Sequence, residues 1–318
     1  MPAIAKGAAM NQAAFYWHLG DFRAIYRFDQ DYQALHRPSD PSDPMNITAY
    51  LGSAWQDFIA NQLALFGSMP VFLALGNHEL IPPKSRDQAL LQFADWFDAP
   101  EIREQRLRDD PHDHAVRAYY HWIKDGIDFL TLDNASPEEF DGEQMKWIQA
   151  VLKRDETNTS IRAVIVGMHE ALPESISIGH SMNQSLVGQD SGRQVYGSLL
   201  YLKLRSKKPV YLLASHSHFY MDGIFNTEYW RGHGGVLPGW IIGTAGAERY
   251  TLPPNATDAK SAKAHAYGYL LASVDFSKDN PVHFDFEELK ETDVPAEVVS
   301  RFSADVVHEC WVGNPDMH

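Results

Sequence analysis

The chain contains the stretch Leu73-Ala74-Leu75-Gly76-Asn77-His78-Glu79, in which an apolar run stops at a glycine and an amide, an imidazole and a carboxylate follow. The run over residues 70–75 is short, continuous and bounded by proline and glycine, which indicates a strand buried on both faces. The polar side chains then lie just beyond the carboxyl end of that strand, where open α/β sheets bind ligands. Taken alone, the pattern fits a ligand site and a solvated turn equally well.

Three further apolar runs end in polar residues in the same way. The run over 14–19 leads into Gly20-Asp21, the run over 163–166 into Gly167-Met168-His169, and the run over 210–214 into Ser215-His216-Ser217-His218. Carboxylate, amide and imidazole groups bind manganese, iron or zinc without thiolate ligands. The four strand ends together therefore predict a metal site.

Composition limits what kind of protein this is. With 318 residues and no linker or internal repeat, we interpret the chain as one domain over residues 1–318. Its single cysteine, Cys310, excludes an intrachain disulfide and a cysteine-based zinc site. The formal net charge of -15 argues against a nucleic-acid-binding surface. No membrane span or signal peptide is evident, so we expect a cytoplasmic protein by default, unless a targeting segment precedes the given sequence.

Apolar periodicity predicts helices between the strands, over residues 2–12, 46–63, 86–97 and 141–152. The pair Asp125-Gly126 predicts a hairpin, and two later alternating runs predict an antiparallel pair, over 267–276 and 282–286. Alternating strands and helices indicate α/β layers. In a parallel sheet a helix that precedes a strand normally returns from an earlier strand, but no strand is predicted before the helix over residues 2–12. The chain thus starts one strand late, which suggests a miscalled start, a fragment or a departure in the fold.

Three segments lack clear periodicity. Residues 23–44 and 100–117 are predicted as irregular surface segments because they are charged, aromatic or proline-rich. Residues 170–200 are rich in serine, glycine, glutamine and asparagine. A long polar connection of this kind is typical of a lid or substrate loop, and equally of a disordered flap.

The ordered set of strand-end motifs resembles the calcineurin-like metallophosphoesterases, the family that includes purple acid phosphatases and cyclic-nucleotide phosphodiesterases. The resemblance covers roughly residues 14–250, and the block Gly76-Asn77-His78-Glu79 is quite specific. It implies a four-layer α-β-β-α sandwich of two mixed β-sheets, here missing its first strand. It also implies a phosphoric ester hydrolase that uses metal-activated water on small-molecule phosphate mono- or diesters.

The resemblance assigns roles to individual residues. Asp21 would bridge two metal ions, manganese, iron or zinc. The second metal site would be completed by Asn77, His169 and His216, and His218 would belong to the first site. His78 would lie over the substrate as general acid or electrostatic stabiliser, so that the catalytic residues are His78 and Asp21.

The chain departs from the family pattern in two places. The last block reads Ser215-His216-Ser217-His218 where Gly-His-x-His is usual, and the opening Asp-x-His block is absent. One full metal site is therefore expected instead of two. His18 precedes Gly20-Asp21 but points to the opposite face of its strand from the next residue, which disfavours it as a ligand. Arg23 is expected either to contact a substrate phosphate, together with His78, or to pair with a nearby carboxylate.

Three functions are compatible with this pattern. The first is metal-dependent phosphoester hydrolysis, with activity reduced by the absent block. The second is a degenerate relative that binds one metal or a phosphate ligand with little or no catalysis. The third is a structural or interaction protein whose histidine clusters lie on the surface. The identity of the substrate lies beyond the pattern, because the segments that would select it have no fixed geometry in the sequence.

Overall fold

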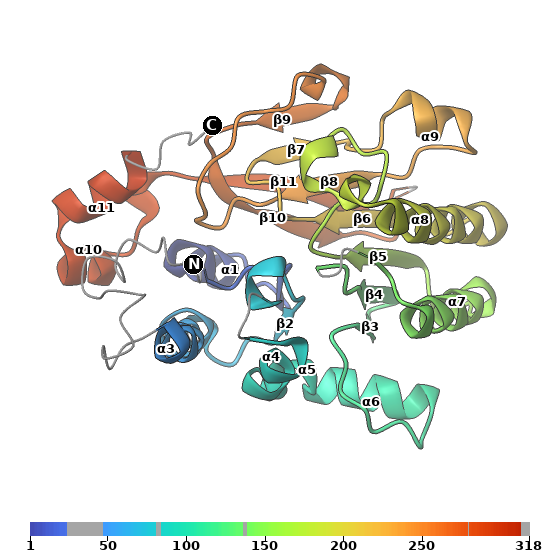
Figure 1. The fold of residues 1–318 in the computed structure, drawn as a ribbon, viewed down its shortest axis with the longest axis horizontal. Helices are drawn as coiled ribbons and strands as arrows, with labels where there is room; N and C mark the ends of the chain where they lie inside the picture. The colour runs from blue at the N-terminus through green and yellow to red at the C-terminus, as the bar shows by residue number, and fades with distance from the viewer. Residues whose placement is uncertain (24–46, 81–83, 136–138, 279, 313–318) are drawn as a thin grey trace.

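The computed structural model describes residues 1–23, 47–80, 84–135, 139–278 and 280–312. Its helices and sheets form layers around two apolar cores (Figure 1). Apart from Arg23, the irregular segment predicted over residues 23–44 lies outside these ranges. No helix within them is both long and apolar enough to cross a membrane.

The largest sheet has seven strands in the order β3-β4-β5-β6-β8-β7-β9. Strands β4, β5, β6 and β8 run parallel, whereas β3, β7 and β9 join antiparallel at the two sides. The strands are Tyr120–Lys124 (β3), Ile127–Thr131 (β4), Ala163–Gly167 (β5), Val210–Ala214 (β6), Tyr220–Asp222 (β7), Gly239–Ile242 (β8) and Ser261–Lys263 (β9). The predicted hairpin between β3 and β4 is confirmed, since Asp125 and Gly126 both have the positive φ that its turn needs.

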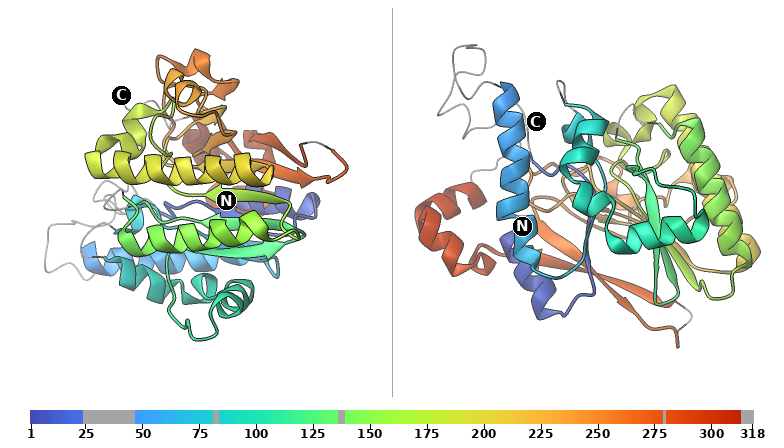
Figure 2. Two further views of the ribbon diagram at one scale, coloured as in Figure 1. Left: turned by 90° about the vertical axis from the view of Figure 1, so that its right-hand side faces the viewer. Right: turned by 90° about the horizontal axis from the view of Figure 1, so that it is seen from below.

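Two long helices cover one face of this sheet, α7 (Gly142–Thr157) and α8 (Leu186–Ser206) (Figure 2). Asp141 caps α7 as predicted, because its carboxylate accepts hydrogen bonds from the backbone N–H groups of Glu143 and Gln144. The apolar stripes of both helices pack on the outward side chains of β4, β5 and β6 and form one of the two cores.

The other face of the seven-stranded sheet packs on two smaller sheets. Strands β1 (Tyr16–His18) and β2 (Val71–Leu73) form a parallel pair, and β10 (Tyr267–Val274) and β11 (Val282–Leu289) form the predicted antiparallel pair. Aromatic rings join the layers: Trp122 of β3 stacks on Phe72 of β2, with ring centroids 3.9 Å apart. At the other side of the layer Tyr220 stacks on Phe286 at 4.2 Å.

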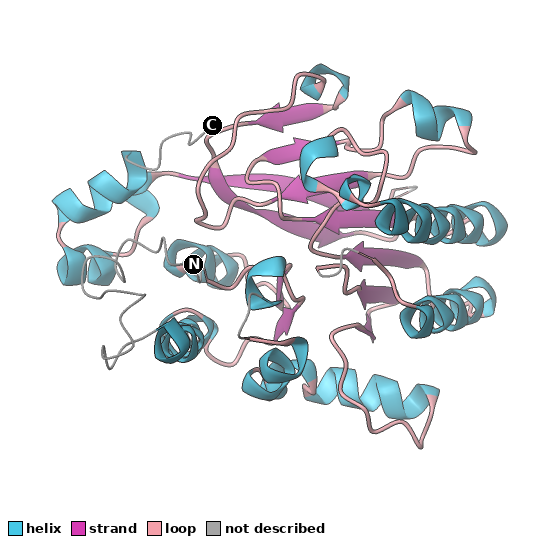
Figure 3. Cartoon of the chain, viewed as in Figure 1, coloured by secondary structure: helices cyan, strands magenta, loops and turns pink. Residues whose placement is uncertain are grey.

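Helices complete the fourth layer outside β1 and β2. They are α3 (Ile47–Asn61), α4 (Arg86–Gln92) and α5 (Ala94–Phe97), so the helix predicted over 86–97 is interrupted at Phe93. Trp55, Phe58 and Phe93 are buried against the small sheet. Figure 3 shows the strands enclosed between helices, and the predicted α-β-β-α order is thereby confirmed.

A cavity of about 1760 Å³ separates the two small sheets. Consecutive residues of both small sheets line it, 15–23 around β1 and 268–274 in β10. Helix α1 (Pro2–Met10), which confirms the helix predicted over 2–12, also borders it and packs on β10, since Gly7 lies directly against the ring of Tyr269. Within the described residues β1 pairs with β2 and has no strand neighbour on its other side.

Two segments predicted as irregular contain helices. Residues 100–109 form α6 (Pro100–Asp109), which starts at a proline and is held by ion pairs of Arg103 and Arg106 with Asp98. The polar connection over 170–200 ends early, because Ser185 caps α8 by accepting a hydrogen bond from the Gly188 backbone N–H at 2.9 Å. Residues 186–200 of this segment are thus helical, and a lid or substrate loop over its first half stays a prediction. The remaining helices are α9 (Glu228–Gly232), α10 (Ala296–Phe302) and α11 (Ala304–Val312).

Candidate metal centre

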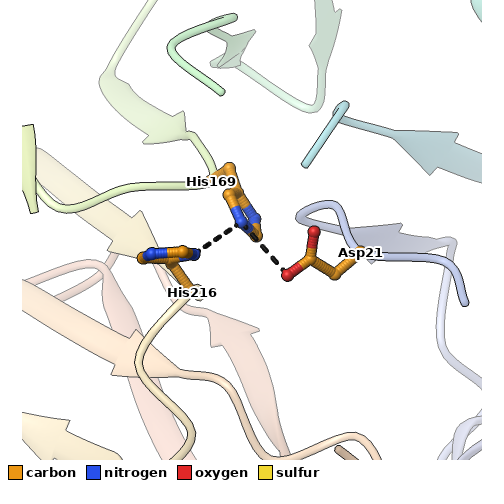
Figure 4. Close-up of side chains that lie close together, drawn as sticks. All are labelled: Asp21, His169 and His216. Atoms are coloured by element: carbon orange, nitrogen blue, oxygen red, sulfur yellow. Dashed lines mark hydrogen bonds and ion pairs between the residues drawn. The ribbon is translucent and has the colours of Figure 1, made fainter. Parts of the chain in front are cut away.

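The carboxyl ends of β1, β2, β5 and β6 meet at one edge of the two packed sheets. Asp21 follows β1, Asn77 starts the 3-10 helix after β2, His169 follows β5 and His216 follows β6. Asp21, His169 and His216 each offer one ligand atom, and these atoms lie within 4.8 Å of one another (Figure 4). The structure thus brings together side chains that are far apart in the sequence.

The imidazole of His169 is at the centre of this cluster. It is buried, and its Nδ1 lies 2.9 Å from the carbonyl oxygen of Leu19, to which it donates a hydrogen bond. Its other nitrogen, Nε2, then faces Asn77 Oδ1 at 2.9 Å, His216 Nδ1 at 2.9 Å and Asp21 Oδ2 at 3.3 Å. The Leu19 carbonyl therefore fixes which ring nitrogen points into the cluster.

This donor set fits a cation better than it fits protons. One proton at most lies on His169 Nε2, yet Asn77 Oδ1, His216 Nδ1 and Asp21 Oδ2 all approach that nitrogen. A metal ion between these groups would accept electron pairs from all of them at once. A carboxylate, an amide oxygen and two imidazoles are also the ligands that bind manganese, iron or zinc in the absence of thiolates.

Glu79 connects the two turns that carry Asp21 and Asn77. Its side chain is fully buried, and Oε2 accepts hydrogen bonds from the backbone N–H groups of Gly76 at 2.8 Å and Asp21 at 2.9 Å. Its Oε1 accepts a third from Phe22 at 2.8 Å. Asp21 in turn accepts a hydrogen bond from the His78 backbone N–H at 3.1 Å. Glu79 therefore holds both turns in the geometry that directs Asp21 into the cluster.

The backbone at the cluster adopts conformations that side chains disfavour. Asp21 has φ 56° and His216 φ 42°, both in the left-handed region. Gly76 passes so close to Asp21 that a Cβ added to it would lie 2.2 Å from Asp21 Oδ1. Gly20 has φ 98° and contacts the same turn. These two glycines are needed because the turns after β1 and β2 touch through their backbones.

Charges within the cluster perturb one another. Burial opposes ionisation of Asp21, but His169 and His78 outweigh it and hold the pKa of the carboxyl far below its usual range. Burial likewise disfavours a charge on His169, yet Asp21 and the Leu19 carbonyl outweigh it and raise its pKa to about 9. The pKa of His216 falls to about 3 through burial and the neighbouring His169, so its imidazole is neutral.

His218 lies in the same cavity but outside the group of three ligands. Its ring stacks on Tyr250 with centroids 4.3 Å apart, and its Nδ1 has no hydrogen-bond partner within the described part of the chain. Burial lowers the pKa of His218 to about 4, against the opposing effect of Asp21. Its predicted role as a ligand of a further metal stays a prediction.

The other predicted residues fall into two groups. His78 and Arg23 line the cavity beside the cluster, and Arg23 Nη1 lies 3.7 Å from the Asp57 carboxylate, the pairing that was one of its two expected contacts. Burial lowers the pKa of His78. The ring of His18 also lines the cavity, and it meets the rings of Phe22 and Phe58 edge-on. That it is not a metal ligand stays a prediction.

Sequence reasoning missed several residues that support the cluster. Asn134, just beyond β4, is buried and exchanges two hydrogen bonds with the backbone of Glu170, next to His169, at 2.9 and 3.1 Å. Its position directly after an apolar strand would have allowed its prediction from the sequence. Ser215 donates a hydrogen bond to the Leu19 carbonyl at 2.7 Å. Tyr250 had no local signal, because it lies in an irregular segment after β8.

Comparisons with known proteins agree with this geometry. The chain matches the profile of the calcineurin-like phosphoesterases over residues 4–220, which is more than half of its length. A search of curated proteins found no match.

Among solved structures, a purple acid phosphatase isolated from yellow lupin (Lupinus luteus) seeds is 15% identical, with a TM-score of 0.56. The match covers 90% of this chain and 46% of the lupin chain, so the present chain spans less than half the length of that enzyme. At this identity the likeness shows the fold alone. A weaker match, to an enoyl-CoA hydrotase/isomerase family protein from Silicibacter pomeroyi, has 14% identity and a TM-score of 0.20, covers 30% of this chain and 42% of the other, and has no bearing on the fold. The chain belongs to the calcineurin-like phosphoesterase family.

Proposed function

We propose that this protein hydrolyses small-molecule phosphate mono- or diesters with the help of a bound divalent metal. The observation that carries the proposal is the convergence of Asp21, Asn77 and His216 on Nε2 of His169, at distances of 2.9 to 3.3 Å. Membership of the phosphoesterase family supports the same reaction class. The metal is manganese, iron or zinc, as the donor set favours.

Each residue of the cluster has a separate task in this proposal. Asp21, Asn77, His169 and His216 hold the metal. When bound, the metal supplies Lewis acidity and lowers the pKa of a water molecule from 15.7 towards about 7. Asn77 contributes an oxygen ligand without adding negative charge opposite an anionic phosphate. The carbonyl of Leu19 keeps the His169 ring oriented so that Nε2 faces the metal.

His78 and Arg23 are assigned to the substrate. The backbone N–H of His78 donates to Asp21, which places His78 directly beside the metal ligands. Its imidazole would protonate or stabilise the leaving oxygen. Burial lowers the pKa of this ring, and the negative charge of Asp21 opposes that shift. Arg23 would approach the phosphate from its position near Asp57 at the cavity wall.

A second candidate function is a one-metal binding protein with little catalysis. It is favoured by the position of His218, which stays outside the group of three ligands. A site for a second metal would have only Asp21 and His218 from the predicted set. Both functions predict that the same four residues bind a first metal, but only the first function predicts substantial hydrolysis of phosphate esters.

The test combines metal analysis with hydrolysis assays. The protein is stripped with a chelator, dialysed against manganese, zinc or iron, and analysed for metal per chain. Hydrolysis of p-nitrophenyl phosphate and bis(p-nitrophenyl) phosphate is then measured. The wild type is compared with Asp21→Asn, and with His233→Gln as a control, because His233 is an exposed histidine outside the cavity.

Bound metal and hydrolysis that are lost together in Asp21→Asn, and kept in His233→Gln, are expected. Metal binding without hydrolysis of either ester would favour the binding protein. A wild type that retains no more metal than Asp21→Asn would contradict both functions.

A further inference from the structure

Three aromatic rings form one wall of the cavity beside the cluster. The ring of Tyr250 stacks on His218 on one side, with centroids 4.3 Å apart and planes 26° apart. It also stacks on His180, with centroids 5.0 Å apart and planes 29° apart. The ring of His180 in turn contacts the candidate metal ligands, because it meets His216 edge-on with centroids 5.4 Å apart. All four rings line the same cavity.

These rings come from segments that have no sequence relation to one another. His180 ends the 3-10 helix Ile178–His180 between β5 and α8, His218 follows β6, and Tyr250 lies in the irregular segment after β8. The segment of Tyr250 is also tied to that of His218 by the backbone, since the Tyr250 N–H donates to the His218 carbonyl at 3.2 Å. The ring of Tyr250 thus packs on both imidazoles, and its removal would take this contact from each of them.

We propose that Tyr250 is a positioning residue of the metal site, which orients His218 and His180 by stacking on both rings. This inference rests on the proposed function, because the orientation of an imidazole ring affects activity most where that ring binds metal or substrate. Groups that orient metal ligands influence metal affinity although they do not touch the metal. Tyr250 itself is not a ligand in this proposal.

The experiment uses substitutions of the ring. Tyr250→Leu removes the stack, and Tyr250→Phe keeps the ring. Tyr229→Leu is the matched control, because Tyr229 stacks on His233 with centroids 4.0 Å apart, outside the cavity. The first measurement is the imidazole NMR signals of the metal-free proteins, with the signal of His218 assigned from His218→Gln. The second is manganese affinity by calorimetry, and the third is the separation of kcat from KM on p-nitrophenyl phosphate.

Tyr250→Leu is expected to shift the His218 and His180 signals and to weaken manganese binding by about tenfold. Tyr250→Phe is expected to preserve both, and Tyr229→Leu to change only the His233 signal. Unchanged His218 and His180 signals in Tyr250→Leu, or equal losses of manganese affinity in Tyr250→Leu and Tyr229→Leu, would overturn the proposal. If the wild type binds no manganese, the proposed function fails, and the NMR comparison alone then decides whether Tyr250 orients the two rings.

Discussion

The buried carboxylate of Glu79 accepts a hydrogen bond from the backbone N–H of Asp21 at 2.9 Å, although the two residues are 58 positions apart. The same carboxylate also binds the N–H groups of Gly76 and Phe22. Burial, together with the negative charge of Asp21, raises the pKa of Glu79 to about 8. The turn that presents Asp21 is therefore held by a side chain of the neighbouring turn, and Glu79 acts on the cluster through the backbone of that turn.

Glu79→Gln is expected to lower the free energy of unfolding by about 1–3 kcal/mol, because the NH₂ group that replaces one carboxylate oxygen cannot accept a backbone N–H bond and leaves a buried donor unsatisfied. Metal affinity should fall as well, since Asp21 loses its fixed orientation. Urea denaturation and calorimetric metal titration measure the two effects. Glu104→Gln, at an exposed position on α6, provides the control and should change neither quantity. Equal stability of the two variants would argue against this role for Glu79.

Asn77→Ala tests the amide ligand. The substitution removes the oxygen that lies 2.9 Å from His169 Nε2, and we expect at least a tenfold lower metal affinity with loss of phosphoester hydrolysis. Metal content after dialysis and the rate of p-nitrophenyl phosphate hydrolysis are the measurements. Asn255→Ala is a matched control, because the side chain of Asn255 makes no capping hydrogen bond at its 3-10 helix. An Asn77→Ala protein with full metal content and activity would remove Asn77 from the ligand set.

The sequence predicted the strand ends because each combines an apolar run with a polar turn, two signals that are local. It failed where the stabilising contacts are distant. Helix α6 has few apolar residues, and both its buried side, Ile102 and Gln105, and the contact of Asp109 with His121 of β3 are evident only in three dimensions. The polar composition of α8 concealed the spacing of its buried residues, among them Val195 and Leu199.

The distinction between local signals and distant contacts also applies to the site. Asp21, Asn77, His169 and His216 were predictable as neighbours because the carboxyl ends of parallel strands meet at one edge of a sheet. Tyr250 was not, since its contact with His218 depends on how an irregular segment returns across the cavity. Glu79 belongs to the predicted motif, but its function as an acceptor of three backbone hydrogen bonds needs the turn after β1 to be in place.

A second buried ionic network lies away from the candidate metal ligands, and from it we can predict how stability depends on pH. His121 of β3 contacts Asp128 of β4 at 2.8 Å through Nδ1 and Asp109 of α6 at 2.6 Å through Nε2. Burial opposes a charge on this ring, but the two carboxylates outweigh it and raise the pKa of His121 to about 9. The nearby Asp155 has its pKa raised to about 8 by burial and by Asp128.

The raised pKa of His121 predicts a loss of stability as the pH rises from about 6.5 to 9, whereas the raised pKa of Asp155 predicts a loss that begins near its ordinary value of 3.8 and is complete above about pH 8. Since the folded pKa of His121 exceeds its ordinary value of 6.5, its contribution is full below about pH 6.5 and disappears as the pH rises through about 9. The loss should be on the order of 3 kcal/mol. Unfolding by urea at several pH values measures it in the metal-free protein. His121→Gln should be less stable at pH 6 and show a flatter profile between pH 6.5 and 9, whereas the exposed control His112→Gln should follow the wild type. Parallel profiles of wild type and His121→Gln would contradict this explanation.

Gly76→Ala tests whether the contact between the two turns is required for the site. A Cβ at this position would lie 2.2 Å from Asp21 Oδ1 and 2.3 Å from the Asp21 backbone nitrogen, distances that force the two turns apart. We expect the variant to lose about 1–3 kcal/mol of stability through overpacking and to lose metal affinity, because Asp21 is displaced from His169. Gly197→Ala is the contrasting substitution, since the space around Gly197 on α8 is open within 4 Å. Gly197→Ala should gain about 0.5–1 kcal/mol of stability, because alanine is favoured over glycine within a helix, and should bind metal as the wild type does. If Gly76→Ala bound metal as tightly as Gly197→Ala, the close approach of the turns would not be what orients Asp21.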